Sequence, residues 1–335
     1  MREDTRRRIG QTHLSADACS LKRLQKHTTL STIGRTMNPT RRQVFEEWFR
    51  LARPFSLTAA AVPVFFGTAL AFKDGSFVLG PFFAMLFGSL LIQAATNMFN
   101  EFYDAQRGLD VAGTVGIAGS IVSGRVTARR VLAGALLCYT LALILGIYLI
   151  VVGGWPILVL GCLSALGGYL YSAGPRPIAY TPASEAAVFL FMGVLIVVIA
   201  YAVQVRDFPL YVPLAALPIG GLVAAILLAN NIRDLTSDRR GGRRTLPVVF
   251  GREVAILVYR ALLLEAYIAV AVLMAFGVVP PECALVFPSV FAAFRLWRDV
   301  ASYSTPRRLD PVVKRTAGLH LVFGLLYTVG VLIGA

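Results

Sequence analysis

Long runs of apolar residues, separated by short polar breaks, make up most of the chain after Arg53. A helix needs about 20 predominantly apolar residues to cross a bilayer. Segments of suitable length and composition lie at 54–72, 79–99, 131–153, 155–173, 184–204, 210–230, 253–277, 280–297 and 316–334. This pattern predicts an all-α polytopic membrane protein with about nine transmembrane helices.

Residues 1–48 have a different character, since they are polar, rich in Arg, Ser and Thr, and poor in acids. Such a composition predicts a basic, disordered cytoplasmic tail, followed by one transmembrane domain at 49–335. The composition leaves two alternatives open: a transit peptide, or a true start at Met37.

The composition supports the bilayer as solvent, because 57% of the residues are hydrophobic and 15% are charged. The net charge of +14 comes from basic residues in alternate loops, so it indicates topology and no nucleic-acid partner. Lys73 and Arg206 are the only basic residues in the loops of one side, and Arg260 lies inside a span. We therefore expect a multi-pass protein of the cytoplasmic (inner) membrane, with a cytoplasmic N-terminus. The expected cytoplasmic loops are 105–130, 231–252 and 295–315.

Polar residues cluster where the second predicted span ends. They are Asn97, Asn100, Glu101, Asp104 and, after Gly108, Asp110. On a helix the first four recur at steps of three and four residues, so they share one face. Several oxygen ligands are thus expected to converge at one membrane boundary.

A second cluster follows the sixth predicted span. It consists of Asn230, Asn231, Arg233, Asp234, Asp238 and Arg239, with Arg243 shortly after. Asp234 and Asp238 are one helical turn apart and point the same way if the helix continues. The loop assignment places both clusters on the cytoplasmic side.

Hard oxygen ligands suit Mg²⁺, which is usually held by one or two carboxylates together with substrate phosphate oxygens. The clusters therefore indicate a diphosphate substrate, with Arg233, Arg239 and Arg243 available to neutralise its charge. The alternative is that each cluster is a solvated helix end with weak surface ion pairs. Two Asn-then-acid clusters on one side favour the functional interpretation.

These motifs resemble those of the UbiA superfamily of intramembrane prenyltransferases, whose members have nine helices and two Asp-rich motifs. The first motif corresponds to Asn100-Glu-Phe-Tyr-Asp104 with Gly108-Leu-Asp110, and the second to Asn231-Ile-Arg-Asp234-Leu-Thr-Ser-Asp238. The segments around Arg53-Pro54 and from Tyr171 to Arg176 are also similar. The chain departs from the family pattern at Glu101, where Asp is commoner.

Within the superfamily, Val115–Val122 and Asn230-Asn-Ile-Arg-Asp234 resemble the 1,4-dihydroxy-2-naphthoate polyprenyltransferases of menaquinone synthesis. The resemblance implies particular roles for the residues of the two motifs. Asn100, Asp104, Asp110, Asp234 and Asp238 would bind diphosphate through Mg²⁺, with Glu101 as a further candidate metal ligand. Asp104 and Asp234 would be essential for catalysis, and Tyr171 and Arg176 would lie near the leaving group. The remaining candidates on the diphosphate or substrate side are Arg53, Asn97, Asn100, Asn231, Arg233 and Arg239.

The predicted reaction moves a polyprenyl group from its diphosphate to an aromatic acceptor, with membrane lipid as surroundings and no obligate protein partner. Other acceptors stay open: 4-hydroxybenzoate, homogentisate, a chlorophyllide or a haem precursor. A cation-coupled transporter is the alternative from another class, although its coupling acids are expected near the bilayer midplane. Three isolated ionisable residues, Glu185, Glu265 and His320, are weaker candidates for chemistry.

Overall fold

The computed structural model describes residues 40–108, 119–172 and 177–335, with the side chain of Ser172 excepted. The chain divides into two units, one that ends at Glu46 and one that covers Glu47–Ala335. The following description concerns the second unit by itself. The predicted tail, residues 1–48, lies largely outside the described residues.

Every regular element among the described residues is a helix, which confirms the predicted all-α class. The elements are α2 (Arg41–Ala52), α3 (Pro54–Lys73), α4 (Leu79–Gln106), α5 (Ala128–Gly153), α6 (Trp155–Ser172), η1 (Ile178–Tyr180), α7 (Ser184–Val188), η2 (Phe189–Leu195), α8 (Ile196–Val205), α9 (Tyr211–Arg240), α10 (Leu246–Phe250), α11 (Arg252–Ala275), η3 (Pro281–Ser289), α12 (Val290–Ser302) and α13 (Pro306–Ile333). Of these, η1 and η3 are 3₁₀ helices and η2 is one turn of π-helix that joins α7 to α8.

Seven helices in the described part of the chain are long and apolar enough to cross a membrane. They are α3, α4, α5, the continuous run Ser184–Val205, α9, α11 and α13. The predicted span at 155–173 is the shorter apolar helix α6, and the one at 280–297 is divided between η3 and α12. The count of nine spans is therefore not confirmed by length and hydropathy.

The spans differ in how much of their apolar surface packs inside the protein. In α9, 78% of the most apolar 18-residue stretch is buried inside the protein, against 17% in α5. Leu143 and Val151 of α5 are largely exposed. An apolar helix with so little protein cover needs lipid as its solvent. Helix α9 is thus central, whereas α5 is peripheral.

Close helix packing holds this core together. A Cβ on Gly193 would lie 2.2 Å from the Cα of Gly220, so only a residue without a side chain permits this contact between η2 and α9. Phe66 of α3 stacks on Tyr327 of α13, with ring centroids 4.3 Å apart. These contacts fix η2 against α9 and α3 against α13.

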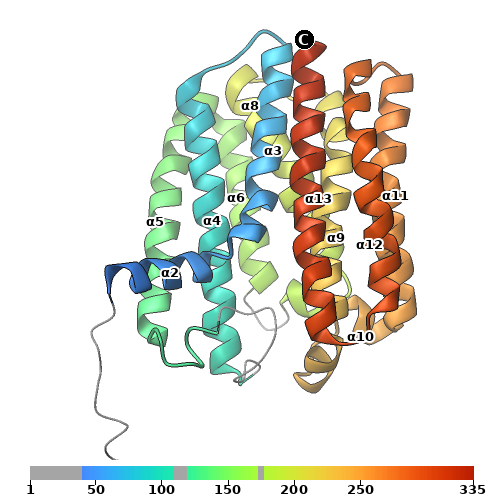
Figure 1. Cartoon of the computed structure of the whole chain (residues 1–335). Coiled ribbons are helices and arrows are strands. Elements are labelled where there is room, and N and C mark those ends of the chain that lie inside the picture. Colours follow the sequence, from blue (N-terminus) through green and yellow to red (C-terminus); the bar gives the residue numbers. More distant parts are fainter. Residues whose placement is uncertain (1–39, 109–118, 173–176) are drawn as a thin grey trace, which may run out of the picture. The chain divides into compact units, whose positions relative to one another are not determined.

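The direction of the helices brings the two acidic clusters to one end of the bundle. Figure 1 shows α4 and α9 ending where α13 begins, while the C-terminus lies at the other end. We call the first of these the motif end and the second the opposite end. The sequence-predicted clusters therefore share one end through the topology of the chain.

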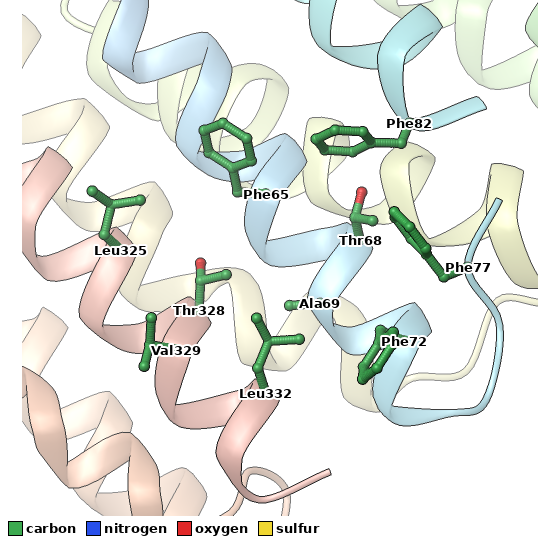
Figure 2. Close-up of a pocket in the computed structure, with 10 residues that line it drawn as sticks. All are labelled: Phe65, Thr68, Ala69, Phe72, Phe77, Phe82, Leu325, Thr328, Val329 and Leu332. Carbon is green, nitrogen blue, oxygen red and sulfur yellow. The ribbon is translucent and has the colours of Figure 1, made fainter. Parts of the chain in front are cut away.

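An apolar groove of about 540 Å³ lies between α3 and α13, towards the opposite end (Figure 2). Phe65, Phe72 and Phe82 line it together with Leu325 and Leu332. Phe65 and Phe72 come from the later half of α3, Leu325 and Leu332 from the later half of α13, and Phe82 from the first turn of α4. All of these segments are far along their helices from the motif end. The groove is thus separate from the acidic clusters.

Candidate active site

Asp104 at the end of α4 and Asp238 at the end of α9 are joined by a single guanidinium group. Arg243 donates from Nη2 to Asp104 Oδ1 at 2.5 Å and from Nη1 to Asp238 Oδ1 at 3.4 Å. The two carboxylates are 134 residues apart in the chain (238 minus 104). The two acidic clusters therefore meet in space and form one polar site.

Arg243 reaches this position because the chain turns back sharply after α9. Gly242 has a φ of 73°, a conformation that glycine adopts without steric cost. The backbone N–H of Arg243 then donates to the carbonyl of Asp238 at 2.9 Å. Thr245 Oγ1 also donates to Asp238 Oδ2 at 3.3 Å, so the loop encloses this carboxylate.

Tyr180, in the short helix η1, is a platform for the arginine. The Arg243 guanidinium carbon lies 4.7 Å from the Tyr180 ring centroid, and that of Arg107 lies 5.1 Å from it. Arg107 also donates to the Tyr180 hydroxyl. Burial lowers the pKa of Arg243, but the negative charges of Asp104 and Asp238 outweigh burial and raise that pKa above its ordinary value.

Asp234 takes part in a separate ion-pair network. Arg233 donates to both of its oxygens, at 2.8 and 2.7 Å, and to Asp310 Oδ1 of α13 at 3.0 Å. The Arg233 side chain is only 4% exposed. Arg233 was predicted to face the diphosphate, but the structure places it in a buried network that ties α9 to α13.

Asn231 connects the second cluster to the start of α7. Its side-chain amide donates to Glu185 Oε1 at 2.8 Å, and Ser184 Oγ donates to Glu185 Oε2 at 2.9 Å. Tyr171, near the end of α6, interacts electrostatically with both Glu185 and Arg243. The structure thus brings Tyr171, Asn231 and Glu185 close to the site that Arg243 joins.

Glu101 is held by a backbone N–H and an arginine of its own, separately from the other carboxylates. Its Oε1 accepts from the backbone N–H of Ser120 at 2.8 Å, and its Oε2 lies 3.8 Å from Arg53 Nη2. It is almost fully buried. In this structure Glu101 anchors the chain that returns to α5, and we do not carry it forward as a metal ligand.

Asn97 and Arg53 lie at the junction of α2, α3 and α4. The Asn97 amide donates to the Ala52 carbonyl and to Ser56 Oγ, both at 2.8 Å. Arg53 adopts a left-handed backbone conformation, with a φ of 51°, between the two helices. Asn97 thus holds the start of α3, away from the Asp104 and Asp238 carboxylates.

The remaining predicted residues fall into two groups. Asn100 is partly exposed one turn before Asp104, and Arg239 is exposed at the end of α9. Asp110 and Arg176 lie outside the described residues. Sequence reasoning missed Tyr180, Arg107, Thr245 and Asp310, because no motif or spacing marks a residue that becomes part of a site only through packing.

The donor chemistry of the site is compatible with Mg²⁺. The described residues hold no group of three His, Cys, Asp or Glu side chains that could bind a metal by themselves. Asp104 and Asp238 nevertheless present carboxylate oxygens to one shared position. Since Mg²⁺ commonly takes one or two carboxylates and completes its shell with water and substrate phosphate, these residues fit it.

Comparison with known proteins identifies the fold and the family. The model of the UbiA prenyltransferase family matches residues 60–320. The chain is 38% identical to 1,4-dihydroxy-2-naphthoate octaprenyltransferase from Bacillus subtilis (strain 168), over 88% of this chain and 95% of the relative.

Two solved structures share the fold. The apo structure of a UbiA homolog from Aeropyrum pernix K1 has a TM-score of 0.61 at 17% identity and covers 82% of this chain and 97% of that one. A UbiA homolog from Archaeoglobus fulgidus bound to DMAPP and Mg²⁺ has a TM-score of 0.58 at 19% identity and covers 84% and 99%. With two acidic helix ends meeting in a membrane bundle, and a family model matched along most of its length, this chain belongs to the UbiA prenyltransferase family.

Proposed function

We propose that this protein is a Mg²⁺-dependent prenyltransferase that transfers a polyprenyl group from polyprenyl diphosphate to 1,4-dihydroxy-2-naphthoate. The products are demethylmenaquinone, in its reduced form, pyrophosphate and carbon dioxide. The observation that carries the acceptor is the 38% identity to the Bacillus subtilis octaprenyltransferase along nearly the whole of both chains.

In the proposed reaction the bond between the allylic carbon and the diphosphate oxygen breaks, and its electron pair leaves with pyrophosphate. The ring carbon that carries the carboxylate forms the new bond to the allylic carbon. Loss of carbon dioxide then returns an electron pair to the ring and restores its aromaticity. Bound Mg²⁺ would supply positive charge for the departing pyrophosphate.

The residues of the site have distinct proposed tasks. Asp104 and Asp238 would hold the metal together with diphosphate oxygens, and Asp234 would orient the second cluster. Arg243 would donate hydrogen bonds to the diphosphate through its planar fork. The ring of Tyr171, near Arg243 and Glu185, would face the allylic carbon as positive charge develops there.

We propose that the protein lies in the inner (cytoplasmic) membrane, with its motif end on the cytoplasmic side. The support is charge asymmetry: the motif end carries Arg107, Arg239, Arg240 and Arg243, whereas Lys73 and Arg206 lie at the opposite end. Positively charged loops stay cytoplasmic. A water-soluble acceptor would then enter from the side where the acidic helix ends meet.

The test is to incubate detergent-purified protein with labelled geranylgeranyl diphosphate and dihydroxynaphthoate, with Mg²⁺ or with a chelator. The masses of the products are then determined by mass spectrometry. We expect a Mg²⁺-dependent product that has gained the prenyl group and lost carbon dioxide. Parallel reactions with 4-hydroxybenzoate and homogentisate test the acceptor. Product with one of these and none with dihydroxynaphthoate would overturn the proposed acceptor, and no product with any of them would overturn the prenyltransferase proposal.

A further inference from the structure

Each acidic side chain that the structure describes in the two clusters is neutralised by an arginine. Glu101 lies near Arg53, Asp234 is paired with Arg233, and Asp104 and Asp238 share Arg243. Four carboxylates at a membrane boundary without counter-charge would be costly. The arginines therefore stabilise these carboxylates at the boundary.

Arg243 differs from the other two in its place in the chain. Arg233 is saturated by two carboxylates and lies inside a long helix, and Arg53 is fixed by the junction of α2 and α3. Arg243 instead belongs to the loop after α9, and it joins carboxylates from two different helices. Its side chain is 21% exposed, against 4% for Arg233. Its Nε, like that of Arg53, is buried without a hydrogen-bond partner, so its contacts are incomplete.

The position of Arg243 is also the position where a metal would be expected. Its guanidinium donates to oxygens of both Asp104 and Asp238, the same oxygens that would bind Mg²⁺. Two cations cannot share these oxygens at low cost, because like charges a few ångströms apart repel strongly in a partly buried site. Binding of the metal therefore requires Arg243 to give up at least one carboxylate.

We propose that Arg243 is a resident cation that competes with divalent metal for the Asp104 and Asp238 carboxylates and turns to the diphosphate when substrate enters. This inference rests on the proposed function, since it assumes a diphosphate substrate. A diphosphate offers the guanidinium a bidentate anionic partner in place of the two carboxylates. The Tyr180 ring, 4.7 Å away, would keep the guanidinium at the site during the exchange.

The consequence is that metal and diphosphate bind together, and metal alone binds weakly. If Arg243 competes with metal, its removal should strengthen metal binding. If Arg243 only supports the structure, its removal should weaken metal binding, because a disordered site would bind metal less well. The sign of the change in metal affinity thus separates the two roles.

The experiment measures Mn²⁺ binding to the detergent-purified full chain without diphosphate, from the electron paramagnetic resonance signal of free Mn²⁺. We expect Arg243→Gln to bind Mn²⁺ about tenfold more tightly than the wild type, because a competing charge is gone. The same variant should show a raised KM for prenyl diphosphate. Arg240→Gln is the matched control, since Arg240 is exposed at the end of α9, three residues before Arg243, and it should leave the Mn²⁺ affinity unchanged.

Two further variants complete the test. Arg243→Lys keeps the charge and loses the planar fork, so its Mn²⁺ affinity should match the wild type while its KM for prenyl diphosphate rises. Tyr180→Leu keeps every charge but removes the platform, and should tighten Mn²⁺ binding about twofold to threefold by loosening Arg243. If Arg243→Gln does not fold, Tyr180→Leu decides the question.

Unchanged or weaker Mn²⁺ binding in Arg243→Gln, or in Tyr180→Leu where it must decide, overturns the inference. Because binding is measured without turnover, the result is independent of the acceptor assay. A wild-type protein that binds Mn²⁺ in the expected way but transfers no prenyl group to any aromatic acceptor would overturn the proposed function alone.

Discussion

The two ends of the bundle pair their acids with different kinds of partner. At the opposite end, Asp74 Oδ2 accepts hydrogen bonds from the hydroxyls of Tyr201 and Tyr211, both at 2.5 Å. At the motif end, Asp104, Asp234 and Asp238 are paired with arginines. Neutral hydroxyl donors hold one geometry and offer nothing to exchange, whereas a cation beside a carboxylate can be replaced by another cation.

From this comparison we infer that an acid of this protein is functional when its partner is a replaceable charge. Asp74 joins the turn after α3 to α8 and α9, so it serves the fold. Asp104 and Asp238 join helix ends through a loop residue that substrate can displace. Four substitutions test this difference, and they follow from the largest expected effect to the smallest.

Asp104→Ala should have the largest effect. Without this carboxylate the metal and diphosphate lose a ligand from α4, and turnover should fall at least about a hundredfold. The measurement is the initial rate of prenyl transfer at saturating Mg²⁺, with the thermal unfolding midpoint as a check on folding. A variant that keeps more than about a tenth of the wild-type rate would remove Asp104 from the metal site.

Arg233→Leu should mainly affect stability. It leaves Asp234 without its bidentate partner and separates α9 from Asp310 of α13. We expect a loss of about 2 kcal/mol in the free energy of unfolding, below the value for a fully buried pair because Asp234 is partly exposed. Thermal unfolding in detergent measures it, with Arg240→Leu as the exposed control. Equal midpoints for the two variants would contradict a structural network.

Glu101→Gln tests whether this residue is a metal ligand or an anchor. The amide keeps an acceptor for the Ser120 N–H but loses its charge against Arg53. We expect kcat/KM to fall about tenfold, as expected for a disturbed second layer of contacts around a metal site, with Mn²⁺ affinity unchanged. Loss of Mn²⁺ affinity in the same proportion would instead restore Glu101 as a ligand.

Asp74→Asn should have the smallest effect. It weakens two hydrogen bonds at the opposite end and should cost about 1 kcal/mol in the free energy of unfolding. The rate of prenyl transfer should remain within about twofold of the wild type, because Asp74 has no part in the proposed chemistry. A large fall in rate without loss of stability would show that the contrast between the two ends is wrong.

Much of the architecture could be predicted from the order of residues alone. Apolar runs long enough to span a bilayer determine helices, because a lipid environment demands internally satisfied backbone groups. The four-residue spacing of Asn100 and Asp104, and of Asp234 and Asp238, depends only on local helix geometry. For that reason the sequence predicted the all-α class, the spans that correspond to α3, α4, α9 and α13, and the two acidic clusters.

The sequence could not distinguish which polar residues face the site and which support the fold. Arg233 and Arg243 look alike in the chain, yet one is locked between Asp234 and Asp310 and the other joins two helix ends. Glu101 and Asp104 are neighbours on α4, yet they meet different partners. Local spacing determined where the acids lie on their own helices, but only tertiary packing decided what each acid contacts, because those partners come from distant segments brought together by the folded bundle.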